Sequence, residues 1–346
     1  GLYTAPSDEA LLFDIKAMKA LEFNMIRKHI KIEPARWYMH CDREGILVWQ
    51  DLPSPNLPSG YEDYAKKNFE DESKRIITAF RNHPSIIQWV VFNEGWGQFD
   101  TERMTQIVIG EVGQSLVCCA SGWVDAPIGD IKDSHSYPNP SCPLDETRAG
   151  VCGEYGGITL KVQGHIWPGG DFQYTTVETG KDFTVLFNNL ADKVIDHYYY
   201  GLNAAVYTQL SDVEIEKNGI YTYDRRVLKP YSATGELKTK IEECINLPQS
   251  GIKVRPILST AKEHKYKWRY ITSSDVPRRW FAKEFDDRTW AEGEAAFGSS
   301  SIWNGANLIS TPWNTSQIHH LAPSFQNIRN RKEILHETNQ HHLPCL

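Results

Sequence analysis

The most constraining feature of the sequence is the stretch Ile86–Gly97, an apolar run that ends on two polar residues. Residues 86–92 are apolar except for Gln88, and this length and β-branched content predict a strand buried on both faces of a sheet. Asn93 and Glu94 follow, before a Gly-Trp-Gly turn. A carboxylate is costly to bury without partners, and catalytic side chains of parallel α/β barrels project from the carboxyl ends of strands. We therefore predict that Glu94 is a catalytic acid.

Glu94 also has a simpler interpretation. Its carboxylate could have a structural role alone, as a cap of the helix expected near Asp100 and Thr101, where a negative charge is stabilised by the helix dipole. The rest of the chain bears on this choice, because a catalytic acid needs partners from other strands.

Strands alternate with helices over most of the first 210 residues, which predicts a parallel sheet with crossover helices. Seven strands are expected, at residues 23–27, 46–49, 86–93, 116–121, 131–135, 151–154 and 204–209. An eight-stranded (β/α)8 TIM barrel needs one more, before the helix that begins at Pro6. We expect a barrel fragment that lacks its first strand, and this choice rests mainly on a resemblance to a known family. An open doubly wound sheet, which tolerates seven strands, is the alternative.

Four segments are expected along the chain. The barrel is predicted to occupy residues 1–235, and a linker with a possible helix to follow over 236–264. Short aromatic segments between polar turns predict a partial all-β sandwich over 265–325. The tail 326–346 is rich in Asn, His, Arg and Lys, and we expect it to be poorly ordered.

Composition excludes several classes of protein. The net charge of −7 comes without a basic stripe, so nucleic acid is not an expected partner. No apolar run approaches the roughly 18 residues of a membrane span, and no N-terminal secretory pattern is present. The seven cysteines form no CxxC pair, which argues against a disulfide framework. The absence of a Gly-x-Ser-x-Gly elbow disfavours an esterase of the α/β-hydrolase type. None of these observations predicts the compartment or the oligomeric state.

Glu154 is the predicted partner of Glu94. It ends the short apolar segment Val151–Gly153 and precedes glycines at positions 156 and 157, where the backbone can turn tightly. Two carboxylates from different strands can flank one glycosidic bond. A separation of about 5 Å makes the second carboxylate a nucleophile and retains configuration, whereas about 6.5–9.5 Å leaves room for water and inverts it.

Several ordered motifs resemble the barrel of glycoside hydrolase family 2, the β-galactosidase, β-glucuronidase and β-mannosidase family, over residues 1 to about 230. They are Asn24–His29, Trp49–Asp51, His83–Ser85, Phe92–Trp96, Ser134–Pro138, Gly153–Gly157, Tyr207–Glu214, Asn218–Gly219 and Thr222–Asp224. Residues 265–325 resemble part of a galactose-binding-like sandwich, through Trp280, Phe285–Asp287, Trp290 and Thr311–Trp313.

The resemblance implies roles for the matching residues. Glu94 matches the acid/base and Glu154 the nucleophile of a retaining β-glycosidase. Asn93 matches a residue that holds the sugar 2-hydroxyl, a contact that strengthens in the transition state. Arg27 matches an arginine that pairs with the nucleophile, and such a cation favours an ionised carboxylate.

Further residues are predicted to bind substrate near these four. They are His29, His135, Tyr137, Trp96, Gln209 and Asp212. The histidines could instead be core residues, Tyr137 could only pack, and Asp212 could lie in a solvated loop. Trp96, Trp123 and Trp167 could stack on sugars or belong to the core. We predict no cofactor and no metal site. Some family members bind magnesium or sodium, but no clear ligand set is present here.

We therefore predict a retaining β-glycosidase for terminal β-linked sugars, most like the β-galactosidase branch, with a carbohydrate as its partner. The missing first strand suggests an alternative, a non-catalytic or vestigial carbohydrate-binding protein. β-Glucuronidase or β-mannosidase specificity on the same scaffold also stays open, because specificity resides in loop contacts to individual hydroxyls.

Overall fold

The computed structural model describes residues 5–54, 62–231, 235–247, 267–271, 286–294, 297–298, 311–312 and 320–323. They fall into two compact units, Gly1–Val254 and Arg255–Leu346.

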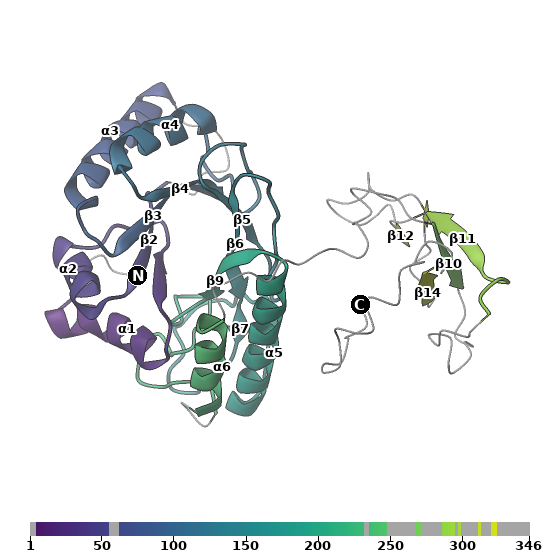
Figure 1. Cartoon of the computed structure of the whole chain (residues 1–346). Helices are drawn as coiled ribbons and strands as arrows, with labels where there is room; N and C mark the ends of the chain where they lie inside the picture. Colours follow the sequence, from purple (N-terminus) through teal and green to yellow (C-terminus); the bar gives the residue numbers. More distant parts are fainter. Residues whose placement is uncertain are drawn as a thin grey trace. The chain divides into compact units, whose positions relative to one another are not determined.

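The first unit is built on seven longer parallel strands with helices on their outer side (Figure 1). The strands are β1 (Met25–Lys28), β2 (Leu47–Asp51), β3 (Ile86–Asn93), β4 (Leu116–Ser121), β5 (Ile131–His135), β6 (Ala149–Gly156) and β9 (Leu202–Thr208). They pair in the orders β1-β2-β3-β4 and β5-β6-β9, all in parallel. The predicted parallel α/β architecture is confirmed, with strand ends shifted by a few residues.

The helices of this unit alternate with the strands. They are α1 (Asp8–Ala20), α2 (Ala35–Glu44), α3 (Asp63–Phe80), α4 (Thr101–Val112), α5 (Gly180–Tyr199) and α6 (Gly235–Ile245). The short strands β7 (Ile158–Thr159) and β8 (Thr175–Thr176) form a separate parallel pair. None of the helices in the described part of the chain combines the length and the apolar character needed to cross a bilayer.

Local sequence sets the ends of several helices. Ser7 precedes α1 and its hydroxyl accepts a hydrogen bond from the Ala10 amide at 3.3 Å. Thr179 does the same for α5 through the Asp182 amide at 3.1 Å. Such caps satisfy amides that have no partner inside the helix. Gly45 ends α2 with a left-handed φ of 67°, a conformation that glycine adopts without strain.

Two apolar layers hold the strands in place. One lies among the strands themselves and consists of Trp49, Val90, Cys118, Ile131 and Val151, one from each of five consecutive strands. The other lies between strands and helices and includes Ile15, Ile77 and Phe92. Strand β3 contributes to both layers, since every residue of it except Ile87 is buried. The prediction of a strand buried on both faces is therefore confirmed, and the filled interior is that of a packed barrel rather than a pore.

The second unit is described only in short strands. β10 (Lys267–Ile271) lies between β11 (Ala291–Glu294) and β14 (His320–Pro323) in an antiparallel sheet, and β12 (Phe297–Gly298) pairs with β13 (Thr311–Pro312) in parallel. Much of the predicted sandwich, most of the linker and the whole tail 326–346 lie outside the described residues.

Candidate active site

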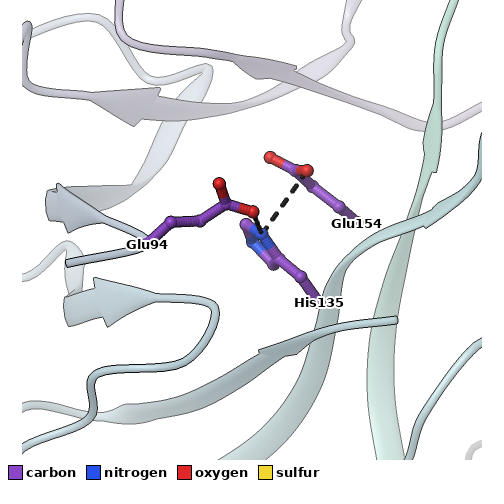
Figure 2. Close-up of side chains that lie close together, drawn as sticks. All are labelled: Glu94, His135 and Glu154. Atoms are coloured by element: carbon purple, nitrogen blue, oxygen red, sulfur yellow. Dashed lines mark hydrogen bonds and ion pairs between the residues drawn. The ribbon is translucent and has the colours of Figure 1, made fainter. Parts of the chain in front are cut away.

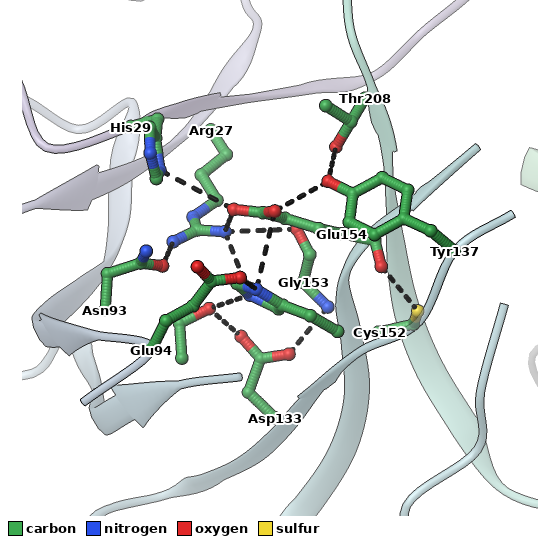
Figure 3. A network of polar contacts seen from close by, with 12 residues as sticks. Arg27, His29, Asn93, Glu94, Asp133, Tyr137, Cys152, Gly153, Glu154 and Thr208 are labelled. Carbon is green, nitrogen blue, oxygen red and sulfur yellow. Dashed lines mark hydrogen bonds and ion pairs between the residues drawn. The ribbon is translucent and has the colours of Figure 1, made fainter. Parts of the chain in front are cut away.

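Polar side chains converge at the carboxyl ends of the seven longer strands. Figure 3 shows several of them, among them Arg27, Glu94 and Glu154. In strand order they are Arg27, Asp51, Asn93 with Glu94, Ser121, His135, Glu154 and Thr208. Because parallel strands share one carboxyl edge, residues more than a hundred positions apart meet there.

Arg27 is the centre of this cluster, although its side chain is only 3% exposed. Its guanidinium forms a two-pronged pair with Asp51, with nitrogen–oxygen distances of 2.8 and 3.2 Å. It also donates to Glu154 Oε1 and to Asn93 Oδ1, each at 2.9 Å. Burial alone would lower the pKa of Arg27, but the carboxylates of Asp51 and Glu154 raise it. The arginine is therefore a permanent cation whose hydrogen bond fixes the orientation of Glu154.

Glu154 receives a second strong hydrogen bond from the opposite side. The Tyr137 hydroxyl donates to Glu154 Oε2 at 2.6 Å and lies 3.0 Å from the Thr208 hydroxyl. The Tyr137 ring stacks on Tyr174 with centroids 3.7 Å apart. His29 Nδ1 lies 3.6 Å from Glu154 Oε1, on a side chain that is 53% exposed. Glu154 is thus held by donors on both oxygens while one edge stays open to solvent.

Glu94 stands in a different environment. It follows the last residue of β3 in a left-handed conformation, with φ of 56°, and its side chain is 18% exposed. His135 Nδ1 lies 2.7 Å from Glu94 Oε1. Burial raises the pKa of Glu94, against the opposing charges of His29 and Arg27 and a hydrogen bond from Trp96. A carboxyl group with a raised pKa keeps its proton closer to neutral pH, as a general acid requires.

The two carboxylates face each other beside one imidazole (Figure 2). One oxygen of Glu94, one of Glu154 and a nitrogen of His135 all lie within 4.8 Å of one another. The 2.7 Å contact between Glu94 and His135 is a hydrogen-bond distance. That this group holds no metal ion stays a prediction.

The family "Glycosyl hydrolases family 2, TIM barrel domain" matches residues 5–133. Residues 5–133 of the chain are thus similar to the barrel domain of glycoside hydrolase family 2. The matched segment contains Arg27, Asn93 and Glu94, whereas Glu154 lies beyond it.

Curated relatives match this chain over a limited part of their length. A β-galactosidase of Oenococcus oeni is 34% identical over 103 residues, which cover 27% of this chain and 10% of that protein. A β-galactosidase of Streptococcus thermophilus is 29% identical over 113 residues, covering 28% of this chain and 11% of that protein. The alignments thus span about a tenth of these relatives.

Solved family 2 structures share the fold. A β-galacturonidase of Eisenbergiella tayi bound to galacturonate has a TM-score of 0.54 at 17% identity, covering 69% of this chain and 48% of that one. A β-glucuronidase of Bifidobacterium dentium has a TM-score of 0.50 at 18% identity, covering 72% of this chain and 45% of that one. At such identities the likeness concerns the fold alone.

The other predicted site residues have varied surroundings. Trp96, Trp123 and Trp167 are 40%, 56% and 42% exposed, so they are surface residues rather than core. Gln209 Nε2 donates to Asn218 at 2.6 Å and to Glu216 at 3.2 Å. Asp212 is buried and pairs with Lys229. Among the described contacts, none joins Asp212 to Glu94 or Glu154, and its substrate role stays a prediction.

Several residues near the site were not predicted as site residues, among them Asp51, Ser121, Asp133, Thr208 and Glu216. Asp51 pairs with Arg27, and Thr208 lies beside Tyr137. Ser121 contacts both His135 and Asp133, and Glu216 contacts Gln209. Asp133 had a readable signal, since its spacing of two from His135 places both on the same face of β5. Ser121 and Glu216 had none, because their proximity depends on how β4 and a late loop are placed.

Proposed function

We propose that this protein is a retaining β-glycosidase that hydrolyses terminal β-linked sugars, with Glu154 as nucleophile and Glu94 as acid/base. The observation that carries the proposal is the separation of the two carboxylates, which have oxygens within 4.8 Å of each other. Such spacing is typical of retaining enzymes, where it is about 5 Å, and is below the roughly 6.5–9.5 Å that inverting enzymes need for a water.

The surroundings of the two groups support these roles in the first half-reaction. Glu154 attacks the anomeric carbon as the bond to the leaving oxygen breaks, and Glu94 gives its proton to that oxygen. Arg27 and Tyr137 hold Glu154 in place as a carboxylate. Burial raises the pKa of Glu94, so this group retains the proton that it must donate.

The second half-reaction uses the same groups in reverse. Glu94, now ionised, takes a proton from water as the water oxygen attacks the anomeric carbon and the bond to Glu154 breaks. In this proposal Asn93 binds the sugar 2-hydroxyl through its amide nitrogen, because its Oδ1 already accepts from Arg27. His29 and Trp96, both half open to solvent, contact the sugar from the rim. No cofactor or metal takes part in either step.

We further propose a neutral sugar, as in β-galactosides. Burial raises the pKa of Glu216, and the charges of Glu154 and Glu94 raise it further. Glu216 is therefore a third carboxyl group that interacts electrostatically with these two. Among described residues, the cations that act on Glu94 are Arg27 and His29, and both already face Asp51 and Glu154. A uronate would add a negative charge among carboxylates, which is unfavourable.

The same proposal extends to the architecture. In the described pairing order, β1, β4, β5 and β9 each have one paired neighbour. An eight-stranded barrel would place a further strand between β1 and β9. The antiparallel sheet of β10, β11 and β14 suits part of a sugar-binding-like sandwich.

The test is hydrolysis of a panel of nitrophenyl β-glycosides by the full-length protein. We expect turnover of the β-galactoside above that of the β-glucuronide, with the β-anomer as the first product by proton NMR. Glu154→Gln should reduce turnover by more than about 10⁴-fold while circular dichroism stays unchanged. Turnover retained in this variant would remove Glu154 from its role, and sugar binding without any turnover would show a carbohydrate-binding protein instead.

A further inference from the structure

Glu94 is connected to a buried carboxyl group through two intervening side chains. His135 Nδ1 lies 2.7 Å from Glu94 Oε1, and His135 Nε2 lies 2.6 Å from Ser121 Oγ. Ser121 Oγ in turn lies 2.5 Å from Asp133 Oδ2. The four groups therefore form an unbroken hydrogen-bonded series across the ends of β3, β4 and β5, which can be followed in Figure 3 from Glu94 to Asp133.

Close packing against glycines fixes both ends of this series. Asp133 Oδ1 accepts a hydrogen bond from the Gly153 amide at 2.6 Å. A Cβ atom at Gly153 would lie 2.2 Å from Asp133 Oδ2, so no larger residue fits beside the carboxyl group. At the other end, a Cβ atom at Gly122 would lie 3.0 Å from Glu94 Cγ and 3.2 Å from His135 Nδ1. The series is thus held at van der Waals contact, with little freedom to open.

The hydrogen atoms of the series can be arranged in two ways. In the first, Asp133 donates to Ser121, Ser121 donates to His135 Nε2, and His135 Nδ1–H donates to ionised Glu94. In the second, each hydrogen has moved one link along, so that protonated Glu94 donates to His135 Nδ1 and Asp133 is ionised. The net change is one proton moved from Asp133 to Glu94. The imidazole is neutral in both arrangements, and every link within the series keeps a donor and an acceptor. Arg27 Nη1, which can only donate, lies 3.3 Å from His135 Nε2 and favours the first arrangement, in which Nε2 accepts.

We propose that Asp133, Ser121 and His135 form a proton relay that sets the protonation state of Glu94, with Asp133 as its buried end. This inference rests on the proposed role of Glu94 as acid/base. That role requires a protonated Glu94 in the first half-reaction and an ionised one in the second, and the relay satisfies both. Asp133 is a positioning residue, since it acts on Glu94 only through the two side chains between them.

The electrostatics of the site agree with the geometry. Burial raises the pKa of Asp133 to about 7, against the opposing charge of Arg27 and hydrogen bonds from Ser121 and Gly153. Burial lowers the pKa of His135 to about 4, so the imidazole is neutral at neutral pH. Several other titratable groups face the relay from the surrounding elements, namely His29, Asp51, Cys118, Glu154 and Glu216.

The test compares pH profiles of kcat/KM for phenyl β-galactoside, whose poor leaving group needs the proton of Glu94. Asp133→Asn replaces the acceptor that faces Ser121 with an amide NH₂, which can only donate. Ser121→Ala removes the second link and leaves Asp133 in place. In both variants the protonated form of Glu94 loses its supporting series. We expect the fall in activity at high pH to move down by about one pH unit or more.

Two controls match these changes. Ser134→Ala alters a serine between Asp133 and His135 whose hydroxyl contacts Ser141 instead. Asp130→Asn alters an exposed aspartate just before β5 that accepts from the Val117 amide. Both should keep the wild-type profile. Unchanged profiles in folded Asp133→Asn and Ser121→Ala would overturn the relay. A shift in Asp133→Asn alone would also overturn it, because the effect would then act through space rather than along the series.

A readout that needs no turnover separates this inference from the proposed function. Infrared difference spectra over a pH titration of the full-length protein should show a protonated carboxyl band that persists towards neutral pH. The band should disappear in Asp133→Asn and change in frequency in Ser121→Ala. If wild-type protein hydrolyses no aryl glycoside but shows these bands, the proposed function fails and the coupled series stands. If the bands are absent while hydrolysis is normal, the relay alone fails.

Discussion

Glu94 and Glu154 lie at the carboxyl ends of β3 and β6, yet their surroundings differ in charge. Glu154 is held by a guanidinium and a phenol, at 2.9 and 2.6 Å, and Arg27 is itself fixed by Asp51. Glu94 contacts a neutral imidazole at 2.7 Å, and burial raises its pKa. In the proposed mechanism, neighbouring charge and burial let the same type of side chain serve as a nucleophile at one position and as an acid at the other.

After Glu154→Gln, the largest loss of activity is expected for Glu94→Gln, which tests whether Glu94 acts as the acid. Removing a general acid costs about 10²–10⁴-fold in rate, and the loss should be greatest for phenyl glycosides, whose leaving group needs a proton. Activity of the wild type should fall as pH rises through the pKa of Glu94, because the acid is lost, and the variant should lack that fall. Stopped-flow assays of phenyl and dinitrophenyl β-galactosides would measure both. Equal losses for both leaving groups would contradict the acid role.

The next effect is expected for Arg27→Met, measured as stability. Breaking a buried ion pair leaves uncompensated charges, at a cost of about 3–5 kcal/mol, here on Asp51 and Glu154. The opposing charge of Arg27 lowers the pKa of Asp51 against the effect of burial, so the variant raises that pKa. As the pH falls, Asp51 then binds a proton more readily in the folded variant than in its unfolded state, and this binding stabilises the folded state. The loss of stability in urea should therefore be smaller at pH 5 than at pH 7, and an equal loss at both would argue against paired charge. Arg27→Lys, which keeps the charge, serves as the matched control.

A smaller effect is expected for Tyr137→Phe. It removes the 2.6 Å donor to Glu154 and keeps the ring that stacks on Tyr174. A hydrogen bond to a charged group contributes about 1.5–3 kcal/mol, so we expect a loss of about 10- to 100-fold in kcat/KM. Trapping with a 2-fluoro β-galactoside would show whether formation of the glycosyl-enzyme is the slowed step. A loss confined to hydrolysis of that intermediate would place Tyr137 on the Glu94 side of the comparison.

The smallest effect is expected for His29→Ala. Its imidazole is 53% exposed and lies 3.6 Å from Asp51 and Glu154. An exposed pair of this kind contributes about 0–1 kcal/mol to stability, so the urea midpoint should hardly move. A rise in KM at unchanged kcat would indicate a contact with the bound sugar. A large fall in stability would show that the imidazole supports the arginine cluster instead.

Much of the architecture was predictable because buried strands and helices leave a pattern of apolar residues in the local sequence. The apolar run of β3 predicted a strand buried on both faces, and polar residues at strand ends predicted Glu94 and Glu154. Arg27 was predicted from the family resemblance. Which strand ends lie next to each other cannot be predicted from the local sequence. Ser121 meets His135 through the arrangement of β4 beside β5, and Glu216 reaches the site through a late loop. Asp212 belongs to a matched motif and pairs with Lys229, and its contact with the sugar stays a prediction.

The sequence by itself determined the order of strands and helices and the residue types available at the strand ends. Periodicity and chain order are properties of neighbouring residues, so they can be read without coordinates. Only the tertiary structure decided that Arg27 joins Asp51 to Glu154, and that Asp133 reaches Glu94 through Ser121 and His135. Those contacts depend on the lateral register of the strands, and a shift of a few tenths of an ångström in a side chain would change them. Both are fixed by the packing of the whole barrel.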